Sequence, residues 1–188
     1  VAISALQLAG CATYGHGVDK ALKSAQKGQY LEAEKGMNEA LSPVGNDRLL
    51  YYMEVGVIKH LQGDYAESNR LLDIAERISE ELEVTGLTDT LTAFMTNPRN
   101  GDYTGADFEK VFINYYKALN YMALGNKAIT SNERLTAIEN ARIESRRLGI
   151  RLNALNSDKG LYSEQKVKDG ELFSQLLDVF DMLIGNAI

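Results

Sequence analysis

The stretch Gly28-Gln29-Tyr30-Leu31-Glu32-Ala33 decides the expected fold, because it recurs as Gly63-Asp64-Tyr65-Ala66-Glu67-Ser68 at a spacing of 63 − 28 = 35 residues. In each copy a glycine precedes a tyrosine and a series of residues suited to a helix. Sequence repeats with periods of about 20–50 residues are typical of repeat architectures. The recurrence therefore predicts two copies of one helix–turn–helix unit.

Alignment on the two glycines places large and small residues at equivalent packing positions. Small residues let two antiparallel helices approach closely, and the glycine turns the chain between them. One helix pair cannot bury its apolar face alone, so neighbouring pairs are expected to stack. The packing positions are Tyr52, Gly56, Leu72 and Ala75 in one copy and Ala21, Ala33, Met37 and Ala40 in the other, and weaker copies contain Gly125-Asn126-Lys127 and Gly185-Asn186-Ala187.

Composition favours the same all-α class. The 188 residues are 45% hydrophobic and 24% charged, with only two prolines and no sustained two-residue alternation of apolar side chains. The repeat spacing is close to the tetratricopeptide period of about 34 residues. We therefore expect an all-α, tetratricopeptide-like helical-hairpin solenoid, interrupted by an insertion at about 86–106. The expected helices are 18–27, 30–41, 47–62, 65–85, 107–124, 128–155 and 164–184, with Asp47 and Asp107 as N-caps.

The N-terminal residues Leu8-Ala9-Gly10-Cys11 resemble a bacterial lipobox, the motif that the lipoprotein signal peptidase reads. The resemblance implies cleavage before Cys11 and lipid on its sulfur and new amino group, and Ala12 resembles the outer-membrane sorting class. The alternative is a small cysteine buried in a first helix. The expected organisation is the end of a signal peptide at 1–10, a lipidated flexible tether at 11–17 and the repeat domain at 18–188, which we expect to be the N-terminal portion of a longer protein.

Few residues suit catalysis or metal binding. One cysteine and two histidines argue against a disulfide framework and a cysteine-based zinc site. The Glu80, Glu81 and Glu83 cluster is typical of a solvated helix face, and His60 is best explained as a packed or capping side chain. A net charge of −6 does not favour nucleic-acid binding. We expect no enzyme, no cofactor and no metal.

The insertion and the helices after it hold the candidate partner-binding residues. Loops of this length are uncommon in compact domains unless they are functional or disordered. Tyrosine and arginine around a partly apolar groove are typical of binding hot spots. A disordered insertion and a solvated arginine face, with Glu139 placed to pair with the arginines, remain alternatives. The candidate residues are Phe94, Tyr103, Phe108, Tyr115, Tyr116, Arg142 and Arg146.

Three longer blocks resemble a family of uncharacterised bacterial tetratricopeptide-repeat outer-membrane lipoproteins. They are 45–54 with 60–70, 103–109 with 114–121, and 141–148. The resemblance implies an all-helical, periplasm-facing repeat protein and no catalytic residues. We expect a non-catalytic scaffold or adaptor that binds another cell-envelope protein and is held to the outer membrane by lipid at Cys11. The alternative is a small-ligand or glycan binding module with a pocket under the 86–106 insertion. The oligomeric state is not predicted.

Overall fold

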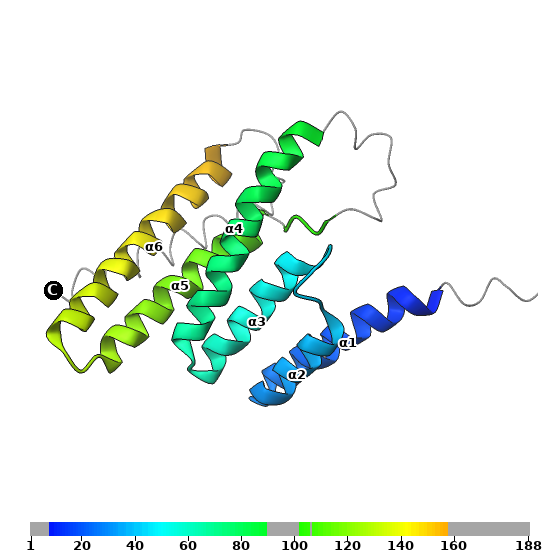
Figure 1. Cartoon of the computed structure of the whole chain (residues 1–188), viewed down its shortest axis with the longest axis horizontal. Helices are drawn as coiled ribbons and strands as arrows, with labels where there is room; N and C mark the ends of the chain where they lie inside the picture. Colours follow the sequence, from blue (N-terminus) through cyan, green and yellow to red (C-terminus); the bar gives the residue numbers. More distant parts are fainter. Residues whose placement is uncertain (1–7, 90–101, 106, 158–188) are drawn as a thin grey trace, which may run out of the picture. The chain divides into compact units, whose positions relative to one another are not determined.

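The computed structural model describes residues 8–89, 102–105 and 107–157, and over these residues it contains six helices and no strand. The all-α expectation is therefore confirmed for this part of the chain. The helices belong to two compact units, Val1–Gly105 with α1 to α4 and Ala106–Ile188 with α5 and α6 (Figure 1).

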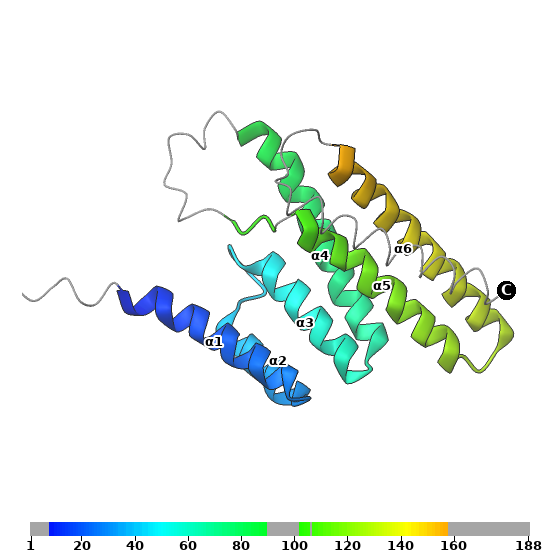
Figure 2. The ribbon, with the colours of Figure 1, turned by 180° about the vertical axis from the view of Figure 1, so that it is seen from behind.

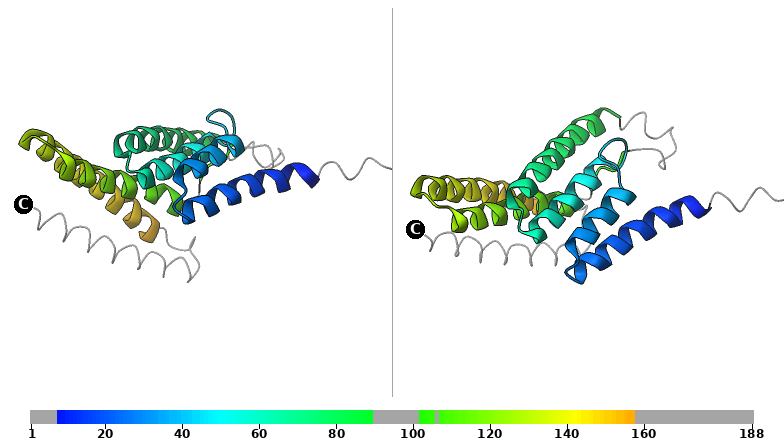
Figure 3. Two further views of the ribbon diagram at one scale, coloured as in Figure 1. Left: turned by 90° about the horizontal axis from the view of Figure 1, so that it is seen from below. Right: turned by 60° about the horizontal axis from the view of Figure 1, so that its bottom comes forward.

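The first unit is built from two helix pairs. Helix α1 packs against α2, α3 packs against α4, and α2 also contacts α3, as the two opposite views show (Figures 1 and 2). Two further views show α1, in dark blue, meeting α2 at their common turn, with the N-terminal part of α1 running on beyond α2 (Figure 3). The bounds are α1 Leu8–Gln26, α2 Tyr30–Ala40, α3 Arg48–Gln62 and α4 Tyr65–Asp89.

Both pairs turn on the repeated glycine. Gly28 and Gly63 have φ angles of 75° and 80°, in the left-handed region that glycine reaches without strain. In each turn the glycine amide donates to the carbonyl three residues back, and the next amide donates to the carbonyl five residues back, at N···O distances of 2.9 or 3.0 Å. This is the Schellman arrangement of a helix C-terminus. The 35-residue repeat thus corresponds to one turn geometry made twice.

The predicted packing positions form the contact between paired helices. A Cβ added at Gly56 would lie 2.9 Å from Cγ and Cδ2 of Leu72, and one added at Gly36 would lie 3.1 Å from Cβ of Ala21. The backbone of α3 is also bonded across the pair, because Ser68 Oγ donates to Gly56 O at 2.7 Å. Of the eight positions, all but the half-buried Tyr52 and Ala40 are buried: Ala21, Ala33, Met37, Gly56, Leu72 and Ala75.

Two boundaries in the first unit differ from the expectation. Helix α1 begins at Leu8 rather than at residue 18, so the 11–17 segment that we expected as a flexible tether is helical. Its two glycines lower helix propensity by only about 1 kcal/mol each, which neighbouring helix-forming residues can offset. Helix α4 continues to Asp89, so the repeat is interrupted later than residue 86.

The helix caps also differ from the expectation. Asp47 takes the N-cap position of α3 but its side chain makes no capping hydrogen bond. Asp107 is the first residue of α5 rather than its cap. Asp64 does cap, since its Oδ1 accepts a hydrogen bond from the Glu67 amide at 3.3 Å.

The second unit contains the helix pair α5 (Asp107–Lys127) and α6 (Ser131–Ser157). Gly125 was expected as the turn of a third copy, and this is wrong, because Gly125 lies inside α5 with ordinary contact to Ala137. The chain reverses instead after Lys127. The expected helix at 164–184 and the weak copy at Gly185 lie outside the described residues.

Candidate functional site

The end of the expected insertion is fastened to the start of α3. The Tyr103 amide donates to Asn46 O at 2.8 Å, and an Arg48 guanidinium nitrogen lies 3.5 Å from Oδ2 of Asp102. Tyr103, within the segment 102–105, is half-buried. All of these residues belong to the first unit.

Tyr115 is part of the core between α5 and α6. It packs against the buried cluster of Val111, Leu148 and Leu152. Tyr116 stacks on Tyr115 edge to face, with ring centroids 5.4 Å apart. Both tyrosines are half-buried, and Tyr115 is the one that packs against the buried cluster. Packing between α5 and α6 therefore explains Tyr115 better than a role as an exposed anchor.

The candidate arginines lie on another side of α6 from the Tyr115 contact. Arg146 is exposed and precedes Leu148 by two residues, which is a rotation of about 200° around a helix. Tyr115 and Arg146 consequently do not face one groove. Within the described residues neither Arg142 nor Arg146 forms an ion pair, so the expected pairing with Glu139 is not made.

The other candidate residues fall partly or wholly outside the description. Phe94 lies outside the described residues, and so does the expected pocket beneath the insertion. Phe108 lies in the first turn of α5, and Cys11 lies in α1, but the side chains of both are outside the described part of the structure.

A buried polar cluster between α5 and α6 was missed by the sequence analysis. Lys117 Nζ lies 3.0 Å from Glu144 Oε1, with side-chain exposures of 2% and 6%. Glu144 also accepts from Asn114 Nδ2 at 2.8 Å and from the more exposed Arg147 at 3.2 Å. Buried charges are tolerated when they are paired and hydrogen-bonded. The spacing of Asn114 and Lys117, three residues apart on one helix face, could have indicated the cluster.

A second polar cluster joins α2 to α3. Lys59 Nζ and Gln62 Nε2 bind the Glu34 carboxylate at 2.8 and 2.7 Å. Burial by itself raises the pKa of Glu34, but the hydrogen bonds from Lys59 and Gln62, with the charge of Lys59, outweigh burial and leave this pKa lowered. The cluster therefore binds the ionised carboxylate and fixes the two helices against each other.

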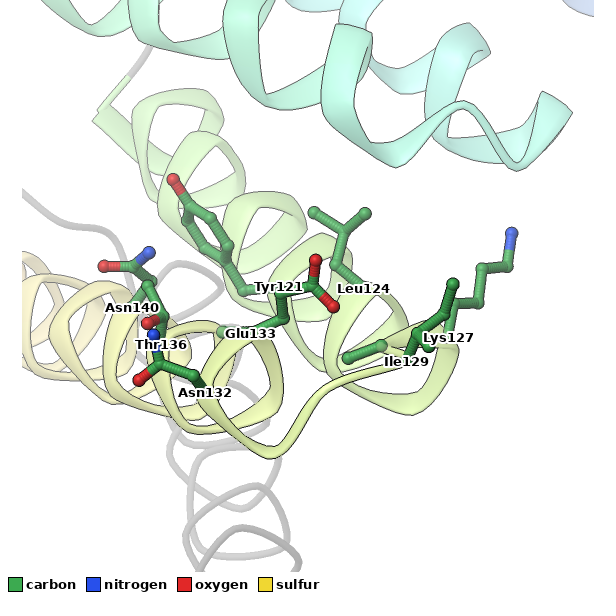
Figure 4. A pocket seen from close by; sticks show the side chains of 10 residues that line it. Tyr121, Leu124, Lys127, Ile129, Asn132, Glu133, Thr136 and Asn140 are labelled. Carbon is green, nitrogen blue, oxygen red and sulfur yellow. The ribbon is translucent and has the colours of Figure 1, made fainter.

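An open hollow of about 500 Å³ lies at the turn between α5 and α6. Figure 4 shows Tyr121 and Asn140 toward one end of the hollow and Lys127 at the other. Hydroxyl, amide and charged groups stand beside apolar ones, an arrangement that can bind a small polar molecule. The lining residues are Tyr121, Leu124, Lys127, Ala128, Ile129, Asn132, Glu133, Thr136, Ala137 and Asn140.

One rim of the hollow is a capping box. The Glu133 amide donates to Thr130 Oγ1 at 3.2 Å, and the Thr130 amide donates back to Glu133 Oε2 at 3.0 Å. The pKa of Glu133 is lowered, first by the hydrogen bond from the Thr130 amide and second by the hydrogen bond with the Thr130 side chain. A threonine followed three residues later by glutamate is a sequence signal for this motif.

Searches for other kinds of site and for similar proteins gave no match. No group of three or more His, Cys, Asp or Glu side chains is placed to hold a metal ion in the described ranges. Over the same part of the chain, every helix is too short or too polar to cross a membrane. No family model, no curated protein and no solved structure matches this chain.

Proposed function

We propose that the protein is a non-catalytic scaffold, a tetratricopeptide-like helical-hairpin solenoid that binds another protein of the cell envelope. The observation that carries the proposal is the turn made twice, at Gly28 and at Gly63, with matching hydrogen bonds. Stacked helix pairs present an extended surface, which suits protein partners better than chemistry on a small substrate. Residues that would anchor such a partner are exposed on both units, including Leu31 at 76% and Ile150 at 69%.

The proposal includes a lipid anchor at Cys11 and an outer-membrane, periplasm-facing location. Its support is the Leu8-Ala9-Gly10-Cys11 motif. Several acyl chains, each adding about 0.8 kcal/mol per buried CH₂, would hold the protein at a bilayer. Mass spectrometry of the native protein tests the anchor. An acylated N-terminal Cys11 is expected, and a native peptide that crosses residues 10–11 uncut would refute it.

The scaffold proposal is tested by photo-cross-linking in intact cell envelopes. A cross-linking amino acid replaces Leu31 or Ile150, both exposed, and in the matched control it replaces Lys27, which is exposed at the turn before Gly28. We expect a discrete adduct with an envelope protein from at least one of the first two positions and none from Lys27. If all three positions give the same diffuse background, the scaffold proposal is wrong.

A second candidate function is the binding of a small polar ligand or glycan, and the hollow at the α5–α6 turn favours it. Amides of Asn132 and Asn140 and the hydroxyls of Tyr121 and Thr136 could bond sugar hydroxyls there. Titration calorimetry with a peptidoglycan disaccharide tests this function. Saturable binding that Asn140→Leu abolishes is expected, and no heat at millimolar disaccharide would exclude this class of ligand.

A further inference from the structure

One side of α6 carries large apolar side chains in solvent. Leu135, Ile143 and Ile150 are 55%, 45% and 69% exposed. At about 100° per residue, the steps of 143 − 135 = 8 and 150 − 143 = 7 residues keep the three side chains within an arc of about 80° around the helix. At about 1.5 Å per residue, the three side chains mark a line about 22 Å long. We call this side, together with the charged residues between them, the outer stripe.

The charged residues of the outer stripe are Glu139, Arg142 and Arg146, and together with the three apolar residues they lie within an arc of about 100° around α6. Neither arginine forms an ion pair within the described residues. Arg147, which is about a quarter-turn from Arg146 around the helix, is bonded to Glu144 at 3.2 Å. The stripe therefore has an excess of positive charge on a chain whose net charge is −6. Two guanidinium groups beside exposed isoleucines are a surface complementary to carboxylates beside apolar side chains.

We propose that the outer stripe is the docking surface for an acidic amphipathic helix of the partner protein. The inference rests on the proposed scaffold function and specifies the face and the partner's chemistry. A line of apolar residues repeating every seven or eight positions matches a helix lying alongside, because side chains of two adjacent helices meet at this period. Aspartate or glutamate on the partner would bind Arg142 and Arg146, since arginine fits a carboxylate through two parallel hydrogen bonds.

The test measures binding of two synthetic helical peptides to the full chain by fluorescence anisotropy. Both peptides have leucine at the a and d positions of three heptads; one has glutamate at e and g, and the other has lysine there. We expect the glutamate peptide to bind at least about tenfold more tightly than the lysine peptide. Equal binding of both peptides, or no saturable binding of either, overturns the proposal.

Variants then locate the binding surface. Arg142→Glu with Arg146→Glu should weaken the glutamate peptide at least about tenfold. The matched control, Lys20→Glu with Lys35→Glu, changes the net charge equally, from −6 to −10, at exposed positions of α1 and α2 and should leave binding unchanged. Ile143→Ser with Ile150→Ser should weaken both peptides. If the control weakens binding as much as the arginine variant, the effect is general electrostatics and the proposal is wrong.

Three further results separate this inference from the scaffold function on which it rests. If the arginine variant loses binding to phosphatidylglycerol vesicles but not to the glutamate peptide, the stripe faces a membrane and the proposal is overturned. If envelope cross-links form while neither peptide binds, the scaffold function stands and the outer stripe is not its docking surface. If the glutamate peptide binds through the arginines while no envelope cross-link forms, the stripe binds acidic helices and the scaffold function is refuted.

Discussion

Replacing Gly56 by alanine tests the close approach of α3 and α4 most directly. The new Cβ would lie 2.9 Å from two carbons of Leu72, a side chain only 1% exposed. Carbon atoms attract one another best at about 3.5–4.0 Å, so the methyl group is at least about 0.6 Å too close. One of the two carbons is Cγ, which cannot move without the rest of the Leu72 side chain. The two helices must therefore separate or Leu72 must leave its rotamer.

The magnitude follows from comparing two glycines that both lie inside helices. Alanine in place of glycine favours a helix by about 1 kcal/mol. Gly149 in α6 has open space around an added Cβ, so Gly149→Ala should gain this amount undiminished. Gly56→Ala gains the same stability from helix propensity and loses about 1–3 kcal/mol of stability to overpacking. The difference between the two variants isolates the cost of the contact.

Thermal unfolding followed by circular dichroism at 222 nm provides the assay. About 1–3 kcal/mol corresponds to a separation of the two melting temperatures by about 2–12 °C in a chain of this size. Gly149→Ala should melt at or above the wild type, and Gly56→Ala should melt below Gly149→Ala by this interval. If Gly56→Ala is stabilised as much as Gly149→Ala, the helices do not approach as described and the repeat register is wrong.

Three further predictions concern the polar contacts. In urea denaturation, Lys117→Met should lower the free energy of unfolding by about 3–5 kcal/mol, because Glu144 stays buried with fewer partners. The double variant Lys117→Met with Glu144→Leu should recover most of the lost free energy of unfolding. Because the pKa of Glu34 is lowered in the folded protein, its carboxylate stabilises the fold above the usual glutamate pKa of 4.5, and this stabilisation is lost as the pH falls through the lower, folded pKa. The difference in melting temperature between wild type and Glu34→Gln should therefore be largest near neutrality and shrink in acid. A difference independent of pH would contradict this. Thr130→Ala should cost about 1 kcal/mol by removing the cap of α6, and unchanged amide exchange in its first turn would speak against the cap.

The sequence predicted the first unit well because its signals are local. A glycine followed by a helix start is a property of a few neighbouring residues, and Gly28 and Gly63 both adopt the expected turn. Gly125 resembles them in sequence but lies inside a helix. The actual turn was signalled by Thr130 and Glu133, whose reciprocal bonds begin α6 three residues beyond the predicted start at 128.

The candidate site was harder to predict because it depends on which helix faces meet. Tyr115 and Arg146 have the composition of a hot spot. Tyr115 of α5, however, packs on the side of α6 that carries Leu148, whereas Arg146 lies on another side of α6. Periodicity marks apolar faces and says little about a polar residue such as Lys117, which is buried in an ion pair with Glu144 on another helix. The three-residue spacing of Asn114 and Lys117 indicates a polar face on α5, but it does not identify Glu144 as the partner.

The repeated turn makes the chain extendable in fixed increments. Residues 28–62 begin at one glycine turn and end just before the next, so a tandem copy would enter and leave through the same left-handed geometry. The residues facing Gly56 would then be Gly36 and Met37 of the copy in place of Leu71 and Leu72, and Ala33 in place of Ser68, whose Oγ donates to Gly56 O. Methionine is flexible enough to accommodate a modest change of spacing. Duplication of residues 28–62 would therefore lengthen the chain by one hairpin, and it would change three of the residues that face Gly56.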